Sequence, residues 1–248
     1  MCAPLAADAT KDDLTEPLKR GVYAVSSANQ KTLIKMMVMP KEEAGFDPSA
    51  FARSDHARSW NPELRLRAES TWMIVQLTFE SYDPQTYDAL EFFLAVAKRL
   101  AVLTDGVVAD PVSQVYRLPE DVFVERPAGE PIAAADHVQA KDRLVEGTWH
   151  CYTLGLSKFH LPEVEVFGVA EANRATAARF LIGLAQSVLT GARLEPGATV
   201  GTKDAPLSVA VGGLDRGMWE GIPCVELIPA EGTTIDAALL SWCASVAK

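Results

Sequence analysis

Apolar residues repeat along this chain with two alternating periods, and this alternation constrains the fold more than any other feature. Residues 71–80 carry apolar side chains at every second position, which is typical of a strand with one buried face. Asp83-Pro84 is a typical helix start, and apolar residues then recur at three- and four-residue steps through residue 101. A short strand at 107–109 follows, so this part of the chain has the order β-α-β.

The second half of the chain shows the same order. Its predicted elements are strands at 148–155 and 163–169, a helix at 172–189, and short strands at 207–211 and 224–228. The spacing of Thr233 and Asp236 resembles a capping box and predicts a C-terminal helix. Residues 136–146 predict a further short helix that ends before Gly147. Residues 31–39 and 48–52 predict an additional strand and an additional short helix in the first half.

These patterns predict an α+β fold with a mainly antiparallel or mixed sheet and helices packed on one face. We expect residues 1–30 to be a loosely ordered lead-in and residues 31–248 to form a single α+β unit. That unit would consist of two halves, about 31–118 and 148–230, and the C-terminal helix. The main alternative, a doubly wound parallel sheet, needs more regular alternation and a Gly-rich first turn.

Two Thr-Trp pairs suggest that the halves are similar β-α-β units. Thr71-Trp72 and Thr148-Trp149 each stand at the beginning of a predicted strand that leads to a long helix. The residue-level similarity around the two pairs is thin, and β-α-β is a common arrangement. The sequence therefore leaves open whether the halves are a true structural repeat.

The composition limits the classes of partner and compartment. The chain has 33 acidic and 23 basic residues and a formal net charge of -10, which argues against a nucleic-acid partner. Its beginning does not resemble a secretory signal, and no apolar stretch approaches the roughly 18–20 residues that a membrane helix needs. We therefore expect a cytoplasmic protein without a membrane partner. Its four cysteines form no CxxC pair and are expected to be buried thiols.

His150, Cys151, His160 and Glu163 are the residues best placed for reactive chemistry. His150 and Cys151 are adjacent on a predicted strand, so they face opposite sides of the sheet and do not easily serve one metal ion or one nucleophile. Glu163 and Glu165 share one strand face, which we interpret as a solvated surface. The sequence predicts no metal and no cofactor.

The loop at residues 212–221 is the strongest candidate for a binding surface. It contains four glycines, and Arg216, Trp219 and Glu220 can form a binding lip, because an exposed Trp beside an Arg suits ligand or interface contact. The alternative is a wide hairpin in which Met218 and Trp219 are packed into the core.

Residues 149–169 (WHCYTLGLSKFHLPEVEVFGV) resemble a family of uncharacterised bacterial proteins, a domain of unknown function. The matching positions are Thr153, Gly155, Phe159, Pro162 and Glu163, and His160 stands where glycine is usual. Residues 106–111 (GVVADP) resemble a second segment of that family. The resemblance implies an α+β fold and bacterial origin, and no activity. The same residues also have a structural interpretation: Gly155 allows a bend, Phe159 anchors the turn, and Pro162 sets up the returning strand.

The leading hypothesis for function is a non-catalytic cytoplasmic binding or protein-interaction protein, with homo-oligomerisation through an exposed strand edge as one form. One alternative is a small-molecule hydrolase that uses His150 or His160 with Glu163. Another is a toxin-immunity or regulatory partner, because an acidic surface can mask a basic protein. Each hypothesis makes a different demand on the geometry around residues 150–165.

Overall fold

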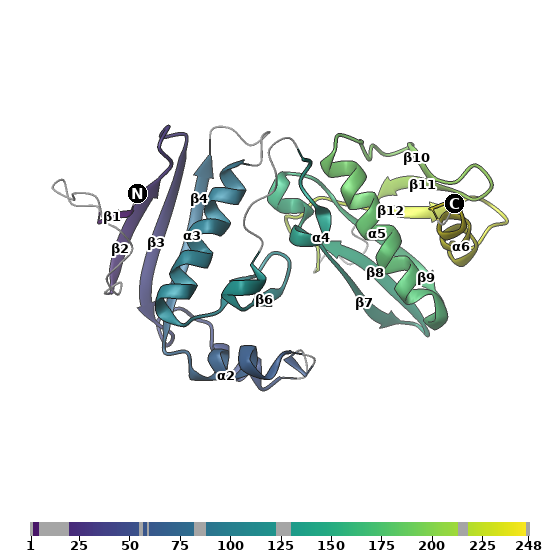
Figure 1. Ribbon diagram of the computed structural model, residues 1–248. Coiled ribbons are helices and arrows are strands. Elements are labelled where there is room, and N and C mark those ends of the chain that lie inside the picture. Colours follow the sequence, from purple (N-terminus) through teal and green to yellow (C-terminus); the bar gives the residue numbers. More distant parts are fainter. Residues whose placement is uncertain are drawn as a thin grey trace. The chain divides into compact units, whose positions relative to one another are not determined.

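The computed structural model describes residues 2–4, 20–54, 57–58, 60–81, 88–122, 130–212 and 218–246 (Figure 1). Over these residues the fold is α+β, with antiparallel and mixed sheets. The chain divides into two compact units, where the sequence predicts one. The first unit comprises Met1–Asp110 and Tyr116–Pro127, and the second comprises Pro111–Val115 and Ala128–Lys248.

The first unit contains a four-stranded antiparallel sheet. Its strands, in spatial order, are β1 (Cys2–Pro4), β2 (Gly21–Ser26), β3 (Thr32–Pro40) and β4 (Met73–Ser81). The structure differs here from the expected lead-in, because β2 pairs along its whole length with β3. A strand that contributes Val25 to the core is an integral part of the sheet.

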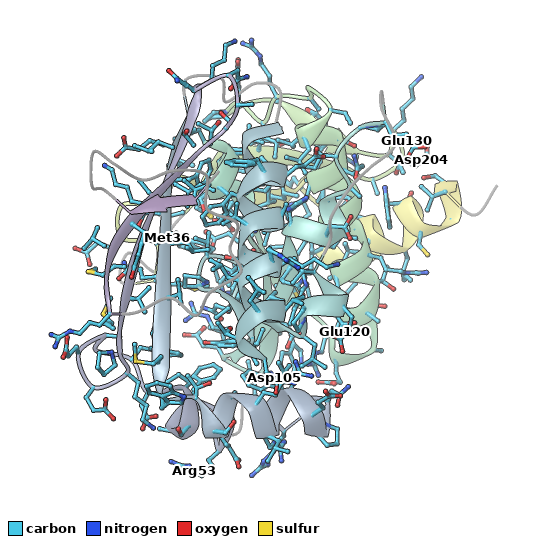
Figure 2. The ribbon with its side chains drawn as sticks, turned by 60° about the vertical axis from the view of Figure 1, so that its left-hand side comes forward. Met36, Arg53, Asp105, Glu120, Glu130 and Asp204 are labelled. Atoms are coloured by element: carbon cyan, nitrogen blue, oxygen red, sulfur yellow. The ribbon has the colours of Figure 1, made fainter. Side chains whose placement is uncertain are left out.

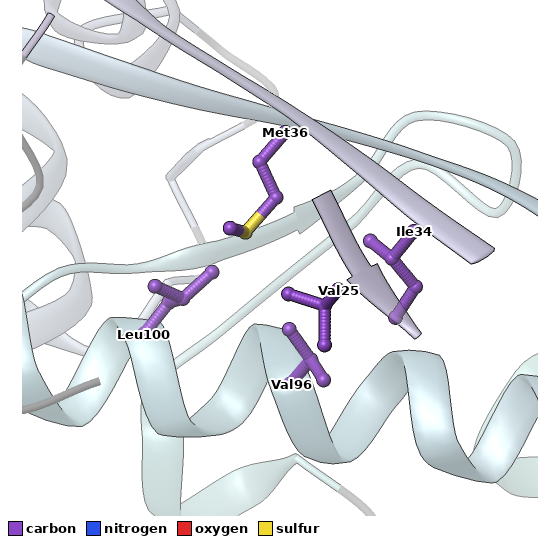
Figure 3. Close-up of a cluster of buried hydrophobic side chains, with 5 residues drawn as sticks. All are labelled: Val25, Ile34, Met36, Val96 and Leu100. Atoms are coloured by element: carbon purple, nitrogen blue, oxygen red, sulfur yellow. The ribbon is translucent and has the colours of Figure 1, made fainter. Parts of the chain in front are cut away.

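Helix α3 (Asp88–Thr104) supplies the other side of the core in the first unit. A cluster of buried side chains, Val25, Ile34, Met36, Val96 and Leu100, lies between the strands and the helix, and its members point toward one another (Figure 3). The period-two pattern of β3 and the helical stripe of α3 therefore meet as the sequence predicts. The predicted helix start at Asp83-Pro84 lies outside the described residues.

Shorter elements complete the first unit. They are α1 (Pro48–Ala52), α2 (Pro62–Ser70), β5 (Val108–Asp110), β6 (Val115–Arg117), which begins in the second unit, and the 3-10 turn η2 (Pro119–Asp121). Asn61 caps α2 by accepting a hydrogen bond from the backbone N–H of Glu63. The strand after α3 pairs with β6 in a separate two-stranded sheet, so the predicted β-α-β order does not form one sheet here.

The second unit contains a six-stranded mixed sheet with the order β10-β11-β12-β9-β8-β7. Its elements are α4 (Ala134–His137), β7 (Gln139–Val145), β8 (Thr148–Leu154), η3 (Leu156–Phe159), β9 (Glu163–Val169), η4 (Glu171–Asn173), α5 (Arg174–Leu189), β10 (Thr199–Gly201), β11 (Pro206–Val211), β12 (Cys224–Pro229) and α6 (Ile235–Val246). β9 and β12 are parallel neighbours, and the other neighbouring strands are antiparallel.

The prediction of a helix over residues 136–146 is wrong beyond residue 137. Residues 139–145 form β7, which pairs with β8 through a tight hairpin. Glu146 and Gly147 both have positive φ, 50° and 85°, as the two central residues of a type I′ turn require. The hairpin therefore overrides the helical tendency of this segment, because β8 offers a complete ladder of hydrogen-bond partners.

Both units contain three consecutive antiparallel strands followed by a long helix: β2-β3-β4-α3 in the first and β7-β8-β9-α5 in the second. The Thr-Trp pairs do not mark equivalent places in this order. Thr71-Trp72 precedes the third strand of the first unit, whereas Thr148-Trp149 begins the second strand of the second unit. The similarity therefore lies in the topology and not in those residues.

Helix α5 covers one face of the six-stranded sheet. Arg174, at its first turn, forms an ion pair with Asp142 of β7 (2.7 Å) and lies 3.5 Å above the Trp149 ring of β8. Val164 and Val166 of β9 face the same side and are fully buried. None of the helices in the described part of the chain is both long and apolar enough to cross a bilayer.

The core of the first unit leads to a test with an internal control. Met36 is 0% exposed beneath α3, whereas its neighbour Met37 faces the other side of the sheet and is 43% exposed. Met36→Ala is expected to lower the free energy of unfolding by about 2–5 kcal/mol, because it leaves a cavity in a packed core. Urea denaturation followed by circular dichroism measures this loss. Met37→Ala should cost less than about 1 kcal/mol, and equal losses for the two variants would contradict the placement of β3.

Candidate functional site

The candidate site lies on the sheet face opposite α5. Because side chains alternate along a strand, the placement of Trp149 and Cys151 on the α5 side directs His150 and Tyr152 to the other side. On β9 the same alternation directs Glu163, Glu165 and Phe167 to that face. A face that carries two carboxylates would normally be solvated, yet Glu163 and Glu165 are 1% and 0% exposed. The sequence interpretation of these glutamates as surface residues is therefore wrong.

The carboxylate of Glu165 is held by hydrogen bonds from two distant parts of the second unit. Its Oε2 atom lies 3.0 Å from Nε2 of His150 and accepts a 2.8 Å hydrogen bond from Nε1 of Trp219. On the other side of the imidazole, Nε of Arg143 donates to Nδ1 of His150 at 3.0 Å. Since the arginine nitrogen only donates, Nδ1 accepts, and Nε2 carries the proton that His150 shares with Glu165. These contacts compensate the cost of burying a charge.

His150 is further fixed by aromatic packing. The register between β8 and β9 shifts by one residue between Trp149 and Cys151, which marks a bulge near Gly168, where φ is +76°. Phe167 of the bulged strand stacks on the imidazole, with ring centroids 4.1 Å apart and planes within 3°. Phe167 thus covers one face of the imidazole, and this packing together with the hydrogen bonds at both ring nitrogens fixes the orientation of His150.

Glu163 forms a second, separate hydrogen-bonded centre. Its Oε2 accepts from the hydroxyl of Thr153 at 2.8 Å, and its Oε1 accepts from the backbone N–H groups of Gly155 (2.8 Å) and Ser157 (3.0 Å). The Thr153 hydroxyl also accepts from the backbone N–H of Val164. Glu163 therefore supplies hydrogen-bond acceptors to the backbone N–H groups of the turn between β8 and β9, and its role there is structural.

Gly155 is required in this turn for two reasons. Its φ is +124°, a region that residues with a side chain rarely adopt, and an added Cβ would lie 2.3 Å from the carbonyl oxygen of His137. The expected bend at Gly155 is confirmed. Together with Thr153 and Glu163, this residue explains the Thr-x-Gly and Pro-Glu positions of the sequence motif by hydrogen bonding and close packing.

Gly212 and Trp219 bring both ends of one loop to Glu165. An added Cβ on Gly212 would lie 2.9 Å from Oε1 of Glu165 and 2.7 Å from the backbone of Val225, so only glycine fits. At the other end of the loop, the Trp219 indole donates its N–H to Oε2 of the same carboxylate. Trp219 also packs with Leu154 and Cys224 in a small apolar cluster. The residues at both ends of the loop, Gly212 and Trp219, therefore lie beside the same buried carboxylate, that of Glu165.

The neighbouring titratable groups respond to this buried negative charge. Glu226 of β12 is opposite Glu165 on the same face, and partial burial together with the Glu165 charge raises the pKa of Glu226. Burial, reinforced by Glu165 and Glu163, also raises the pKa of the Cys224 thiol. On the α5 side, burial raises the pKa of Cys151 to about 12. Neither thiol is a thiolate at neutral pH, as a nucleophile would require.

The predicted binding residues have different environments. Arg216 lies outside the described residues. Trp219 is 5% exposed, so its ring does not form an exposed lip; it is packed inward as in the second interpretation of the loop. Glu220 is exposed beside it. Sequence reasoning did not identify Arg143 and Glu165 as members of a common cluster, because nothing local links them to a tryptophan 54 residues beyond Glu165.

The predicted reactive residues do not converge on one point. His150 is paired with Glu165, whereas Glu163 is engaged by the turn backbone. His160 is exposed and ends η3 in the left-handed conformation. Cys151 and His150 point to opposite faces, as the sequence predicts. Among the described residues, no group of three or more His, Cys, Asp and Glu side chains is arranged to hold a metal ion.

No protein-family model, no curated protein and no solved structure matches the chain. The resemblance of residues 149–169 to a bacterial family therefore stays a prediction, and the site has to be interpreted from its own geometry.

The shared carboxylate makes Glu165 and Trp219 energetically dependent on each other. Glu165→Met removes the acceptor and is expected to lower the free energy of unfolding by about 2–4 kcal/mol, because two buried donors lose their partner. Trp219→Phe keeps the ring packing and should cost about 1–2 kcal/mol. In the double variant the loss should be about 1 kcal/mol smaller than the sum. Chemical denaturation of all four proteins measures this coupling, and strictly additive losses would show that the hydrogen bond does not form.

The raised pKa of Glu226 gives a pH dependence of defined sign. The folded protein binds a proton to Glu226 more tightly than the unfolded chain, whose carboxyl keeps its ordinary value of 4.5. Ionisation of Glu226 therefore destabilises the fold at neutral pH, and this effect disappears as the pH falls through the raised value toward 4.5. Glu226→Gln should be more stable than the wild type at pH 7 and equal to it in acid, as measured by urea denaturation at a series of pH values. An advantage that grows in acid would contradict this sign.

Proposed function

We propose that this chain is a binding protein that recognises a partner protein through the loop between Gly212 and Trp219. The observation that carries the proposal is the attachment of both loop ends to the Glu165 carboxylate, by close packing at Gly212 and by a hydrogen bond at Trp219. Loops held on a rigid base are a common place for recognition, because little conformational freedom is lost at the base on binding. The sequence of the loop adds Arg216, and Glu220 follows it at an exposed position.

The charge of the chain suggests the chemistry of the partner. The formal net charge is -10, and the loop base carries exposed Glu220 and partly exposed Glu226. A negative surface favours encounter with a positively charged surface and disfavours acidic partners. We therefore propose a partner protein with a basic contact surface. A regulatory or toxin-immunity role is one form of this proposal.

The hydrolase alternative has less support from the same geometry. Both ring nitrogens of His150 already have hydrogen-bond partners inside the protein, and the imidazole is covered by Phe167. Glu163 is occupied by three donors in the turn. A general base must reach the proton that it abstracts, whereas the side chains of His150 and Glu163 are 0% and 1% exposed. The cytoplasmic location, the bacterial origin and a homo-oligomeric form stay predictions.

A pair of charge-neutral variants tests the recognition loop. Arg216→Ala combined with Glu220→Ala changes the loop and leaves the net charge and Trp219 unchanged. The matched control, Lys203→Ala with Glu231→Ala, removes one charge of each sign from exposed positions elsewhere in the second unit. Each protein is immobilised and exposed to native lysate, and retained proteins are identified by mass spectrometry and titrated individually by calorimetry.

We expect wild type and control to retain the same partner, and the loop variant to bind it at least about tenfold more weakly. The affinity of the wild type should fall with added salt, because the proposed recognition is partly electrostatic. An unchanged dissociation constant for the loop variant would refute the proposal. Retention of the fold is checked by circular dichroism.

A further inference from the structure

The sheet of the first unit exposes apolar side chains on the face that points away from α3. Because Met36 is buried beneath α3, the alternation of side chains along β3 directs its neighbours to the other face. The strand registers place the equivalent positions of β2 and β4 on the same outer face. The outward positions are Val22, Ala24, Ser26, Leu33, Lys35, Met37, Met39, Ile74, Gln76, Thr78 and Glu80.

Three of these outward residues are large, apolar and exposed to solvent. Val22, Leu33 and Met37 are 54%, 36% and 43% exposed. Val22 and Met37 are directly paired across β2 and β3, so their side chains are neighbours. The outward face of a solvated antiparallel sheet normally carries polar residues. Contiguous apolar side chains at such positions are typical of a surface that binds another protein.

Trp72 extends this apolar surface beyond the first residue of β4. Its carbonyl oxygen accepts a hydrogen bond from the backbone N–H of Lys41 (3.1 Å), which continues the pairing of β3 and β4 by one residue pair. Alternation places the indole on the same side as Ile74, and Trp72 is 74% exposed. Tryptophan is enriched in protein interfaces, because its large ring gains much from burial.

The charges on the outer face are complementary to those of a second copy. The outward positions of β2, β3 and β4 carry one cation and one anion, Lys35 and Glu80, which form an exposed ion pair at 2.5 Å. Two copies of a chain with a net charge of -10 repel each other on average, whereas these strands present a neutral face. A two-fold interface repeats every contact, so Lys35 of each copy can lie over Glu80 of the other.

The size of the outer face fits a weak, reversible dimer. Three strands about 4.8 Å apart and about 30 Å long present an area of about 400 Å² per copy. Stable interfaces bury about 800 Å² per partner, and transient complexes bury less. The area is therefore sufficient for a dimer that forms and dissociates with concentration.

We propose that two copies of this chain associate face to face through the outer faces of β2, β3 and β4. Sheets that pack in this way lie about 10 Å apart with interdigitated side chains, and Val22, Met37 and Trp72 supply the apolar contacts. Each sheet is then covered on both faces, by α3 on one side and by the second copy on the other. The inference is independent of the loop in the second unit and of its proposed role.

Sedimentation equilibrium of the full chain at a series of concentrations tests the proposal. The wild type should show a monomer–dimer equilibrium with a dissociation constant of about 1–100 µM. Met37→Asp should raise this constant at least about tenfold, because the dimer would bury an unpaired charge. Val102→Asp is the matched control, since Val102 is 53% exposed on α3, the helix on the opposite side of the sheet.

Reversal of the two charges on the outer face provides the second arm. Lys35→Glu and Glu80→Lys should each dimerise at least about tenfold more weakly than the wild type, because like charges then meet across the interface. An equimolar mixture of the two variants should associate at least about tenfold more tightly than either variant alone. A purely structural effect on each chain would not be rescued by mixing.

The controls for this arm make the same charge changes elsewhere in the first unit. Arg53→Glu alters an exposed residue that follows α1 and points away from the ribbon, and Glu120→Lys alters an exposed residue of η2, which packs against α3 (Figure 2). Both should dimerise like the wild type, and circular dichroism checks that every variant is folded. The proposal is overturned if the wild type is monomeric up to about 500 µM or if Met37→Asp dimerises like the wild type. Equal losses in the controls, or a mixture that associates no better than its components, would also overturn it.

Discussion

The hydrogen bonds that meet at the buried carboxylate of Glu165 connect three separate parts of the second unit. His150 links β8 to the carboxylate, and Arg143 links β7 to it through the imidazole of His150. Trp219 links the segment before β12 to the same carboxylate. A carboxylate with 0% exposure is tolerated only when such donors replace its water shell. The positions of these strands and of the loop are therefore linked to one group.

The two faces of β9 bury different kinds of side chain, apolar on one face and polar on the other. Val164 and Val166 fill the interface with α5, whereas Glu163 and Glu165 each collect their own set of donors on the other face. The two carboxylates stabilise contacts of different range in the sequence. Glu163 fixes a local turn within ten residues of itself, and Glu165 fixes contacts between segments that are distant in the sequence. The strand is thus buried on both faces, although only one of them is apolar.

The sequence was sufficient to predict the α+β class and most of the elements of the second unit, because apolar periodicity is a local property. It predicted β8, β9 and α5 within two residues at each end. It failed for β7, where pairing with β8 decides the conformation of a segment with weak local preference. It also failed for Glu165. Alternation of polar and apolar residues normally means a solvated face, whereas the donors to this carboxylate come from residues 150 and 219, with residue 143 bound to the imidazole of His150.

The hydrogen-bond network at Glu165 is better explained by a role in positioning the residues around it than by a gain in the stability of the fold. Desolvating a carboxylate is costly, and well-packed apolar residues of similar volume often stabilise a core as much as a buried ionic network does. Apolar contacts, however, are nondirectional, whereas the bond from Trp219 to Oε2 fixes a donor at 2.8 Å along a defined direction. The absence of a Cβ at Gly212 brings the backbone at the other end of the loop against the same carboxylate. The network thus fixes the positions of Gly212 and Trp219 on the second unit, which is the property that a recognition loop needs from its base.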